Sequence, residues 1–136
     1  MNNIVVQKLR NYKELKADIV AIDIEIAELN ETIGIGAQQY TERVQSSNVG
    51  SSVEDQMERK MDKEEKLERV KAFKIREVMR IDNALSVLTE DEKEILTMSF
   101  IEKTKYWKIQ DKFHISYPRI KQIEGEAVRK IEKYFV

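Results

Sequence analysis

The chain has 136 residues, of which 41% are hydrophobic and 36% charged, with a formal net charge of −1, so it forms one or two small units rich in solvated helix. It has no cysteine, which excludes disulfides and thiolate metal sites and agrees with a reducing cytoplasm. No apolar run approaches the ~20 residues that span a bilayer and no signal peptide is evident, so we expect a soluble intracellular protein without membrane contact.

The first predicted element is a long helix from Ile4 to about Glu31, a stretch without glycine or proline. Its apolar residues follow a heptad, which indicates packing against another helix. They are Val5, Tyr12, Leu15, Ile19, Ile22, Ile26, Leu29 and Ile33. Ile4, Leu9, Val20 and Ile24 widen this stripe, so we expect more than one neighbouring helix.

Glycine and serine then predict a loop from about residue 34 to 52, followed by a second long helix from Val53 to about Val87. Two long helices joined by one loop suggest an antiparallel hairpin that buries Ile19, Ile22 and Ile26. The heptad leaves open whether the helices pair within one chain or between chains. We expect residues 1–87 to form a helical hairpin or coiled-coil arm that makes a homodimer or higher homo-oligomer.

Residues 88–136 contain three helical patterns that outline a helix-turn-helix. The first opens with Thr89 and Glu92, a capping box. The second, residues 105–113, has Thr104 as its expected cap and directs Tyr106, Ile109 and Phe113 toward the third helix.

The third helix begins at Ser116, whose hydroxyl can cap it, and Pro118 is tolerated in its first turn. Ile120, Ile123, Ala127 and Ile131 form one buried stripe, which leaves a polar face starting at the N-terminal end. Residues 103–136 hold nine Lys/Arg against four acidic residues, a net of +5 that leaves −6 on residues 1–102. This asymmetry indicates a phosphate-binding surface on the helix-turn-helix.

The run Ile115–Ile131, above all Arg-Ile-Lys-Gln-Ile-Glu and Ala-Val-Arg-Lys-Ile, resembles region 4.2 of sigma-70-type factors, which reads the promoter −35 element. The resemblance implies base contacts by Tyr117, Pro118, Lys121 and Gln122, and phosphate contacts by Arg119 and Arg129. Tyr117 and Pro118 stand where principal sigma factors carry an Arg-Glu pair, so the target need not be the usual −35 sequence. His114 replaces the frequent turn glycine.

A second resemblance covers nearly the whole chain. The long N-terminal helix, the Arg43-Val44-Gln45-Ser46-Ser47 segment, the charged helix with Asp55-Gln56-Met57 and the sigma-like C-terminus are similar to RinA-type late-transcription activators of Gram-positive phages and prophages. The resemblance implies a transcriptional activator in the cytoplasm of a bacterial host cell.

The candidate site residues fall into three groups. Base reading is expected from Tyr117, Pro118, Arg119, Lys121 and Gln122. Phosphate contacts are expected from Lys105, Lys108, Lys112, Ser116 and Arg129. Arg43, Gln45, Ser46 and Ser47 form either an additional phosphate contact or a structural loop.

No residue pattern indicates an enzyme, a metal or a cofactor. His114 is expected to act as a cap or packing residue in the turn, Tyr106 to lie in the core, and Trp107 to lie in the core or an interface rather than to stack on bases.

The expected partners are double-stranded DNA at a promoter or operator, and host RNA polymerase. Two alternatives remain: a DNA-recognition subunit of a phage packaging machine, similar to a small terminase subunit, and a sigma-like factor that binds polymerase without touching DNA. A fold alone does not choose among them.

Overall fold

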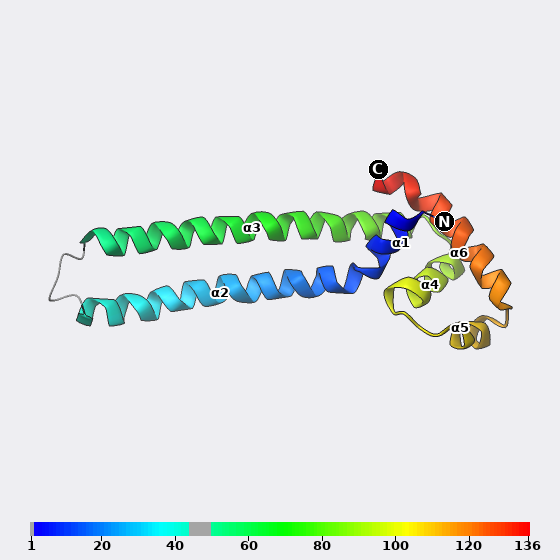
Figure 1. Cartoon of the computed structure of the whole chain (residues 1–136), viewed down its shortest axis with the longest axis horizontal. Helices are drawn as coiled ribbons and strands as arrows, with labels where there is room; N and C mark the ends of the chain where they lie inside the picture. Colours follow the sequence, from blue (N-terminus) through cyan, green and yellow to red (C-terminus); the bar gives the residue numbers. More distant parts are fainter. Residues whose placement is uncertain (1, 44–49) are drawn as a thin grey trace. The chain divides into compact units, whose positions relative to one another are not determined.

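The fold is helical throughout the part of the chain that the structure describes (Figure 1). The computed structural model describes the backbone of residues 2–43 and 50–136, and the side chains of residues 2–31 and 53–136. No strand occurs in these ranges, which confirms the predicted all-α fold. The helices are α1 (Asn3–Arg10), α2 (Tyr12–Arg43), α3 (Gly50–Ser86), α4 (Glu90–Leu96), the π-helix η2 (Thr97–Ile101), α5 (Tyr106–Phe113), α6 (Tyr117–Ile131) and the 3-10 helix η3 (Glu132–Phe135).

The chain divides into two compact units. The first, here called the core unit, combines Met1–Lys16 with Ile75–Val136, and the second, here called the arm, is Ala17–Lys74. The sequence suggested a division into 1–87 and 88–136. The units are divided differently because the start of the chain and the end of α3 both pack with the C-terminal helices.

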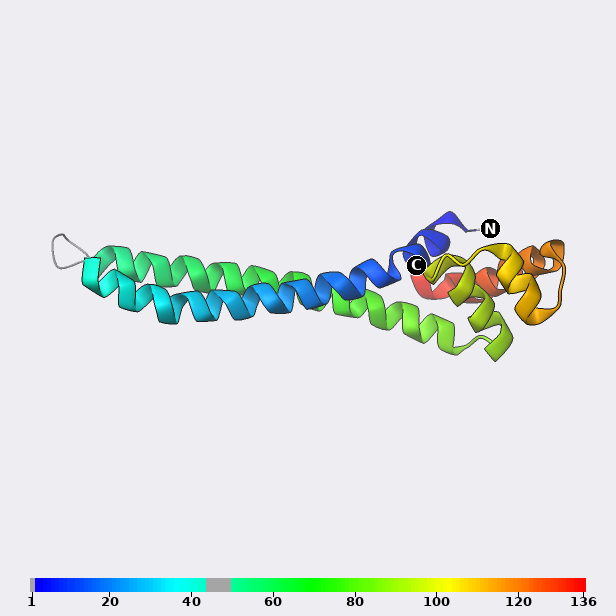
Figure 2. The same cartoon turned by 90° about the horizontal axis from the view of Figure 1, so that it is seen from below.

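In the arm, α2 and α3 lie side by side (Figure 1, Figure 2). Residue numbers fall along one helix as they rise along the other in the ion pairs that join them, so the helices are antiparallel. The pairs are Glu25–Lys63 at 3.8 Å, Asp23–Lys71 at 2.5 Å and Asp18–Lys74 at 2.9 Å. The antiparallel hairpin expected from the sequence therefore forms within a single chain.

The arm buries few hydrophobic side chains. Among those described in this unit, Ile22 is the only buried one, with 8% of its surface exposed, while Ile19 and Ile26 are half-buried. Large hydrophobic side chains on its surface are Val20, Ile24, Val53, Met57, Met61, Val70 and Phe73. The hairpin thus covers one face of each helix and leaves apolar side chains on the others.

The helices of the arm extend further than predicted. α2 runs to Arg43 and α3 starts at Gly50, so both enter the stretch of about 34–52 that was expected to be a loop. Gly34 and Gly36 lie inside α2. A glycine costs a helix roughly 1 kcal/mol relative to alanine, which weakens a long helix without ending it.

The predicted continuous helix from Ile4 is interrupted at Asn11, between α1 and α2. The side chain of Asn2 begins α1 by accepting hydrogen bonds from the backbone N–H groups of Ile4 and Val5, at 2.9 and 3.4 Å. The prediction of one continuous helix was wrong: α1 ends at Arg10, and its residues Val5 and Leu9 pack with the C-terminal helices. Tyr12 and Leu15, at the start of α2, pack against the same cluster.

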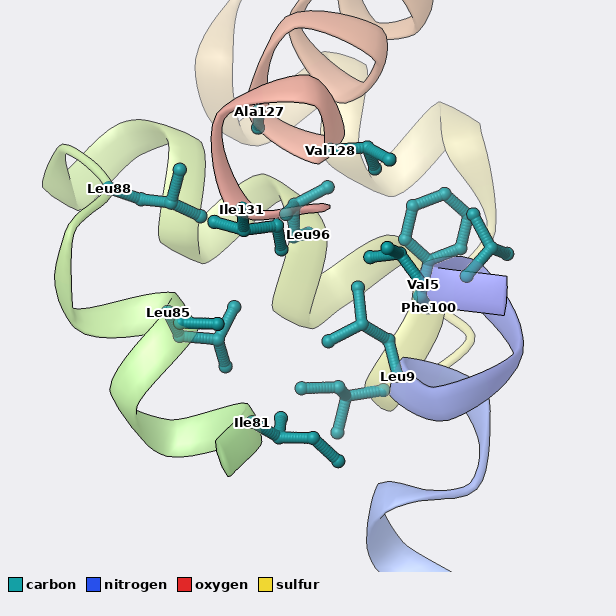
Figure 3. Packing of buried hydrophobic residues seen from close by; sticks show 13 residues of the cluster. Val5, Leu9, Ile81, Leu85, Leu88, Leu96, Phe100, Ala127, Val128 and Ile131 are labelled. Carbon is teal, nitrogen blue, oxygen red and sulfur yellow. The ribbon is translucent and has the colours of Figure 1, made fainter. Parts of the chain in front are cut away.

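Figure 3 shows the main hydrophobic cluster of the core unit. Val5 and Leu9 of α1 are fully buried among side chains from α3, α4, η2 and α6. The labelled partners are Ile81, Leu85, Leu88, Leu96, Phe100, Ala127, Val128 and Ile131. α1 is therefore an integral part of the domain that carries the helix-turn-helix.

Polar contacts also attach α1 to this domain. The ammonium of Lys8 pairs with the Glu77 carboxylate at 2.7 Å, and the Asn2 amide donates to Glu132 at 3.4 Å. The guanidinium of Arg10 lies 5.8 Å from the centre of the Phe100 ring. These contacts complement the burial of Val5 and Leu9.

The helix-turn-helix has a second, smaller core. Ile95, Ile109 and Ile120 are buried at the meeting of α4, α5 and α6. Met98, Tyr106, Phe113, Ile115 and Ile123 pack around them. This confirms the predicted inward direction of Tyr106, Ile109 and Phe113.

The helix ends follow the predicted caps with one exception. The Thr89–Glu92 capping box and the Ser116 cap are both present, whereas α5 is preceded by Lys105, whose side chain makes no capping hydrogen bond. The expected Thr104 cap is wrong because the helix begins one residue later. Instead, the backbone N–H of Thr104 donates to the Met98 carbonyl at 2.7 Å, a hydrogen bond that forms the turn after η2.

Candidate nucleic-acid interface

The N-terminal turn of α6 presents its polar residues to solvent. The Ser116 hydroxyl accepts a hydrogen bond from the Arg119 backbone N–H at 3.3 Å, and Pro118 lies in the first turn, where no helical N–H is lost. Ile120, Ala127 and Ile131 anchor the opposite side at zero exposure. The first turn is therefore held rigidly while its outer side chains are accessible.

The turn before α6 is short and contains a strained residue. His114 ends α5 in the left-handed conformation, with φ 54° and ψ 44°, and its side chain is exposed. A side chain in this conformation costs roughly 1–2 kcal/mol, which explains why glycine suits the position. His114 thus has a turn role, as predicted, and does not pack in the core.

Four of the five residues predicted to read bases lie on the exposed surface. They are Tyr117, Pro118, Arg119 and Gln122. Arg119 Nη1 donates to Gln122 Oε1 at 2.8 Å, so these two side chains are already oriented as a pair. The amide oxygen of Gln122 keeps a second lone pair and its NH₂ group keeps two donors, which leaves it able to contact a base edge.

Lys121, the fifth predicted base reader, is held by its own domain. Its ammonium donates to the Tyr106 hydroxyl at 3.0 Å and to Glu124 Oε2 at 3.2 Å. The hydrogen bond to Tyr106 raises the pKa of Lys121 above its ordinary value, burial acts in the opposite direction, and the attraction of Glu124 adds to the rise. The ammonium therefore remains charged at neutral pH.

The residues predicted to contact phosphate differ in how far contacts within the chain already engage their side chains. Lys105, Lys108 and Arg129 are exposed, and Arg129 Nε donates to the Gly125 carbonyl at 3.2 Å. Lys112 is exposed but forms an ion pair with Glu94, so a phosphate would have to compete with that carboxylate. The Ser116 hydroxyl is engaged as the helix cap.

Exposed aromatic side chains accompany these cations. Trp107 is 61% exposed, with the Lys108 ammonium 5.5 Å from its ring centre. Trp107 was expected to lie in the core or in an interface; its exposure rules out the core, and the interface stays a prediction. Tyr106 is half-buried in the smaller core, as predicted.

Sequence reasoning missed Glu124, the one buried charged residue among the described side chains, at zero exposure. Its Oε1 atom has no hydrogen-bond partner, while Oε2 accepts from Lys121. A signal was available, because position 124 follows Ile120 by four and precedes Ala127 by three, which places it on the buried stripe.

The remaining predicted contacts lie outside the described residues. These are Gln45, Ser46 and Ser47, together with the side chain of Arg43.

The described residues include no group of three or more His, Cys, Asp or Glu side chains suited to a metal ion, and their helices are too short or too polar to cross a membrane.

A surface hollow of about 460 Å³ lies beside α4 and η2, lined by Glu90, Lys93, Glu94, Thr97, Met98, Glu102 and Lys112. Three carboxylates and two ammonium groups give it a negative balance. Such a hollow is poorly suited to phosphate, so the interface proposed for nucleic acid lies with α6 and the cations of α5.

The chain was compared with known protein families, curated proteins and solved structures. Residues 84–133, from the end of α3 into η3, match the family described as Sigma-70, region 4. No curated protein and no solved structure matched the chain. Residues 84–133 are therefore similar to sigma-70 region 4, a family of DNA-binding helix-turn-helix domains.

Proposed function

We propose that this protein is a sequence-specific DNA-binding transcriptional activator of phage or prophage genes, of the late-gene regulator type. The observation that carries the proposal is the exposed polar first turn of α6 within a sigma-70 region 4 domain. The resemblance of the longer chain to RinA-type activators supports the finer assignment to phage transcription. The proposal involves no catalytic step, metal or cofactor.

In this mechanism α6 enters the major groove of promoter or operator DNA with its N-terminal turn against the base edges. Gln122 offers the amide that fits adenine, and Arg119 offers donors that fit guanine O6 and N7. Tyr117 contacts a thymine methyl group or a phosphate. Lys105, Lys108, Lys112 and Arg129 hold the DNA backbone and fix the register without reading sequence.

The proposal also includes self-association through the arm and recruitment of the RNA polymerase of the host. The apolar side chains on the arm surface, such as Val20, Ile24 and Phe73, support self-association. A homo-oligomer would bring two DNA-reading modules to one promoter, where the protein recruits polymerase. A sedimentation mass near the 16.0 kDa of one chain would contradict the oligomer without affecting DNA reading.

The decisive experiment is selection of bound sequences from a random DNA pool at near-physiological salt, followed by footprinting and transcription with host polymerase. We expect one enriched sequence, protection of that sequence and stimulated transcription from a promoter that contains it. A pool without enrichment would contradict sequence reading. A stable polymerase complex without protected DNA would favour the polymerase-binding alternative, and a ring-sized oligomer at a packaging site would favour the terminase alternative.

A further inference from the structure

Glu124 places a carboxyl group inside the helix-turn-helix, where it needs a polar or charged partner. Its side chain is fully buried, and a carboxylate removed from water is unfavourable unless a cation or hydrogen-bond donors compensate it. Lys121 is the one cation paired with it among the described residues, at 3.2 Å. If Lys121 left this position for a DNA base, it would leave a buried carboxylate without its partner.

Lys121 also contacts two aromatic rings at the start of α6. Its ammonium lies 5.0 Å from the centre of the Tyr106 ring and 5.9 Å from that of Tyr117, within the range of cation–π attraction. The two rings meet edge to face, with centroids 5.0 Å apart and an angle of 81°. The four side chains of Tyr106, Tyr117, Lys121 and Glu124 therefore form one connected cluster, here called the tyrosine–lysine cluster.

Tyr117 is the member of this cluster that reaches outward. It is 44% exposed, and it stands at the first position of α6 after the Ser116 cap. The orientation of its ring is set from inside the domain by Tyr106 and Lys121. Arg119 and Gln122, by contrast, hydrogen-bond to each other on the surface.

Magnitudes favour retention of Lys121 within the cluster. A well-formed base contact changes discrimination by roughly five- to 150-fold. Glu124 has no exposed surface but the Lys121 side chain is 41% exposed, so the pair is half-buried and losing it costs less than breaking a fully buried pair. A base contact by Lys121 would have to replace its ion pair with Glu124, its hydrogen bond to Tyr106 and both of its cation–π contacts together.

We propose that Lys121 is a positioning residue: it compensates the buried Glu124 and holds the Tyr117 ring at the angle with which α6 meets DNA, and it does not itself read a base. This inference rests on the proposed function, since it assigns roles within the same DNA-reading surface. It replaces the direct base contact that the sequence suggested for Lys121.

The test compares four variants with the wild type: Tyr117→Ala, Tyr106→Phe, Lys121→Met, and Lys121→Met combined with Glu124→Gln. Each is passed through the random-pool selection at a temperature where circular dichroism shows it folded. We expect Lys121→Met to broaden the preference at the same base position as Tyr117→Ala. Tyr106→Phe should broaden that position more weakly, because it removes one hydrogen bond and keeps the ring.

Binding to the wild-type site supplies the second readout. Lys121→Met should weaken binding by about tenfold, and the double variant should recover to within about threefold of wild type, because a neutral amide needs no cation beside it. Lys108→Met is the matched control, since Lys108 is exposed and makes no ion pair with Glu124. Its effect should be unchanged by Glu124→Gln.

The outcomes separate this inference from the proposed function. Suppose that the wild type selects a sequence, but Lys121→Met loses preference at a base position that Tyr117→Ala leaves unchanged, and that the double variant does not recover. Lys121 would then read a base directly, which overturns this inference and leaves the proposed function intact. A wild type that selects no sequence overturns both.

Discussion

The arm and the core unit differ in how completely they bury their hydrophobic side chains. In the core unit, side chains such as Leu9, Ile81 and Ile131 have zero exposure, whereas the one buried hydrophobic side chain described in the arm, Ile22, is still 8% exposed. The arm helices are joined instead by partly exposed ion pairs, a type of contact that contributes little to stability. The core unit is therefore held by its own packing, and we expect the arm to open first.

The largest expected effect comes from breaking the packing of α1. Leu9→Ala removes a fully buried side chain and should lower the free energy of unfolding by about 2–5 kcal/mol. Thermal or urea unfolding would measure it. Ile4→Ala, on the same helix but with its side chain 62% exposed, is the control and should change stability by less than about 0.5 kcal/mol. Equal effects of the two variants would contradict the assignment of α1 to the core unit.

The next effect concerns binding and leaves stability unchanged. Gln122→Ala should weaken binding to the selected DNA by about 1–3 kcal/mol, because it removes the base contact proposed for this exposed side chain. Fluorescence anisotropy with labelled DNA would measure it. Gln56→Ala, an exposed residue of the arm, should bind as the wild type does. If Gln56→Ala weakened binding as much as Gln122→Ala, the proposal that α6 binds DNA and the arm does not would be contradicted.

A smaller effect depends on pH. Burial alone would raise the pKa of Glu92, but hydrogen bonds from Lys130 and Thr89 lower it below its ordinary value of 4.5. The carboxylate therefore stabilises the folded state fully above pH 4.5, and this contribution is lost as the pH falls through the lowered pKa.

Glu92→Gln should thus cost about 1 kcal/mol at neutral pH, with the difference from wild type shrinking in acid below pH 4.5. Thermal unfolding at several pH values would measure it. Glu102→Gln, an exposed residue after η2, is the control. If the stability difference between wild type and Glu92→Gln grew as the pH fell, the stabilising role of the ionised Glu92 carboxylate would be contradicted.

The smallest effect belongs to the surface of the arm. Glu25 and Lys63 are 3.8 Å apart with side chains 48% and 58% exposed, so Glu25→Gln should change stability by less than about 0.5 kcal/mol. Hydrogen exchange of the arm amides would detect even this local change. A loss comparable to that of Leu9→Ala would mean that ion pairs dominate the arm and that the contrast with the core unit is misplaced.

The local features of the helix-turn-helix could be predicted from the sequence because each depends on residues a few positions apart. Thr89 and Glu92 form their capping box, Ser116 caps α6, and Ile120 and Ala127 are buried, all as their spacing indicated. The same logic located the polar first turn of α6. Whether its side chains contact DNA stays a prediction.

The features that escaped prediction depend on partners distant in sequence. A heptad shows that Val5 and Leu9 need apolar neighbours, but it does not reveal that these come from α6 and η2 rather than α3 alone. The burial of Glu124 was missed because a glutamate is usually assigned to solvent, whatever the helical stripe on which it falls. Tyr106 supplied the further contact that fixes Lys121, and a helix pattern does not specify such cross-helix contacts.

The packing of α1 against α6 also sets the order in which the molecule can assemble. Leu9 belongs to the same cluster as Ile131, so this part of the core closes a chain segment of more than a hundred residues. Closing so long a segment carries an entropic cost that local helix formation avoids, and contacts of this kind slow folding. During synthesis the apolar face of α1 therefore stays unpaired until nearly all of these 136 residues have emerged, and we expect the core unit to complete its packing last.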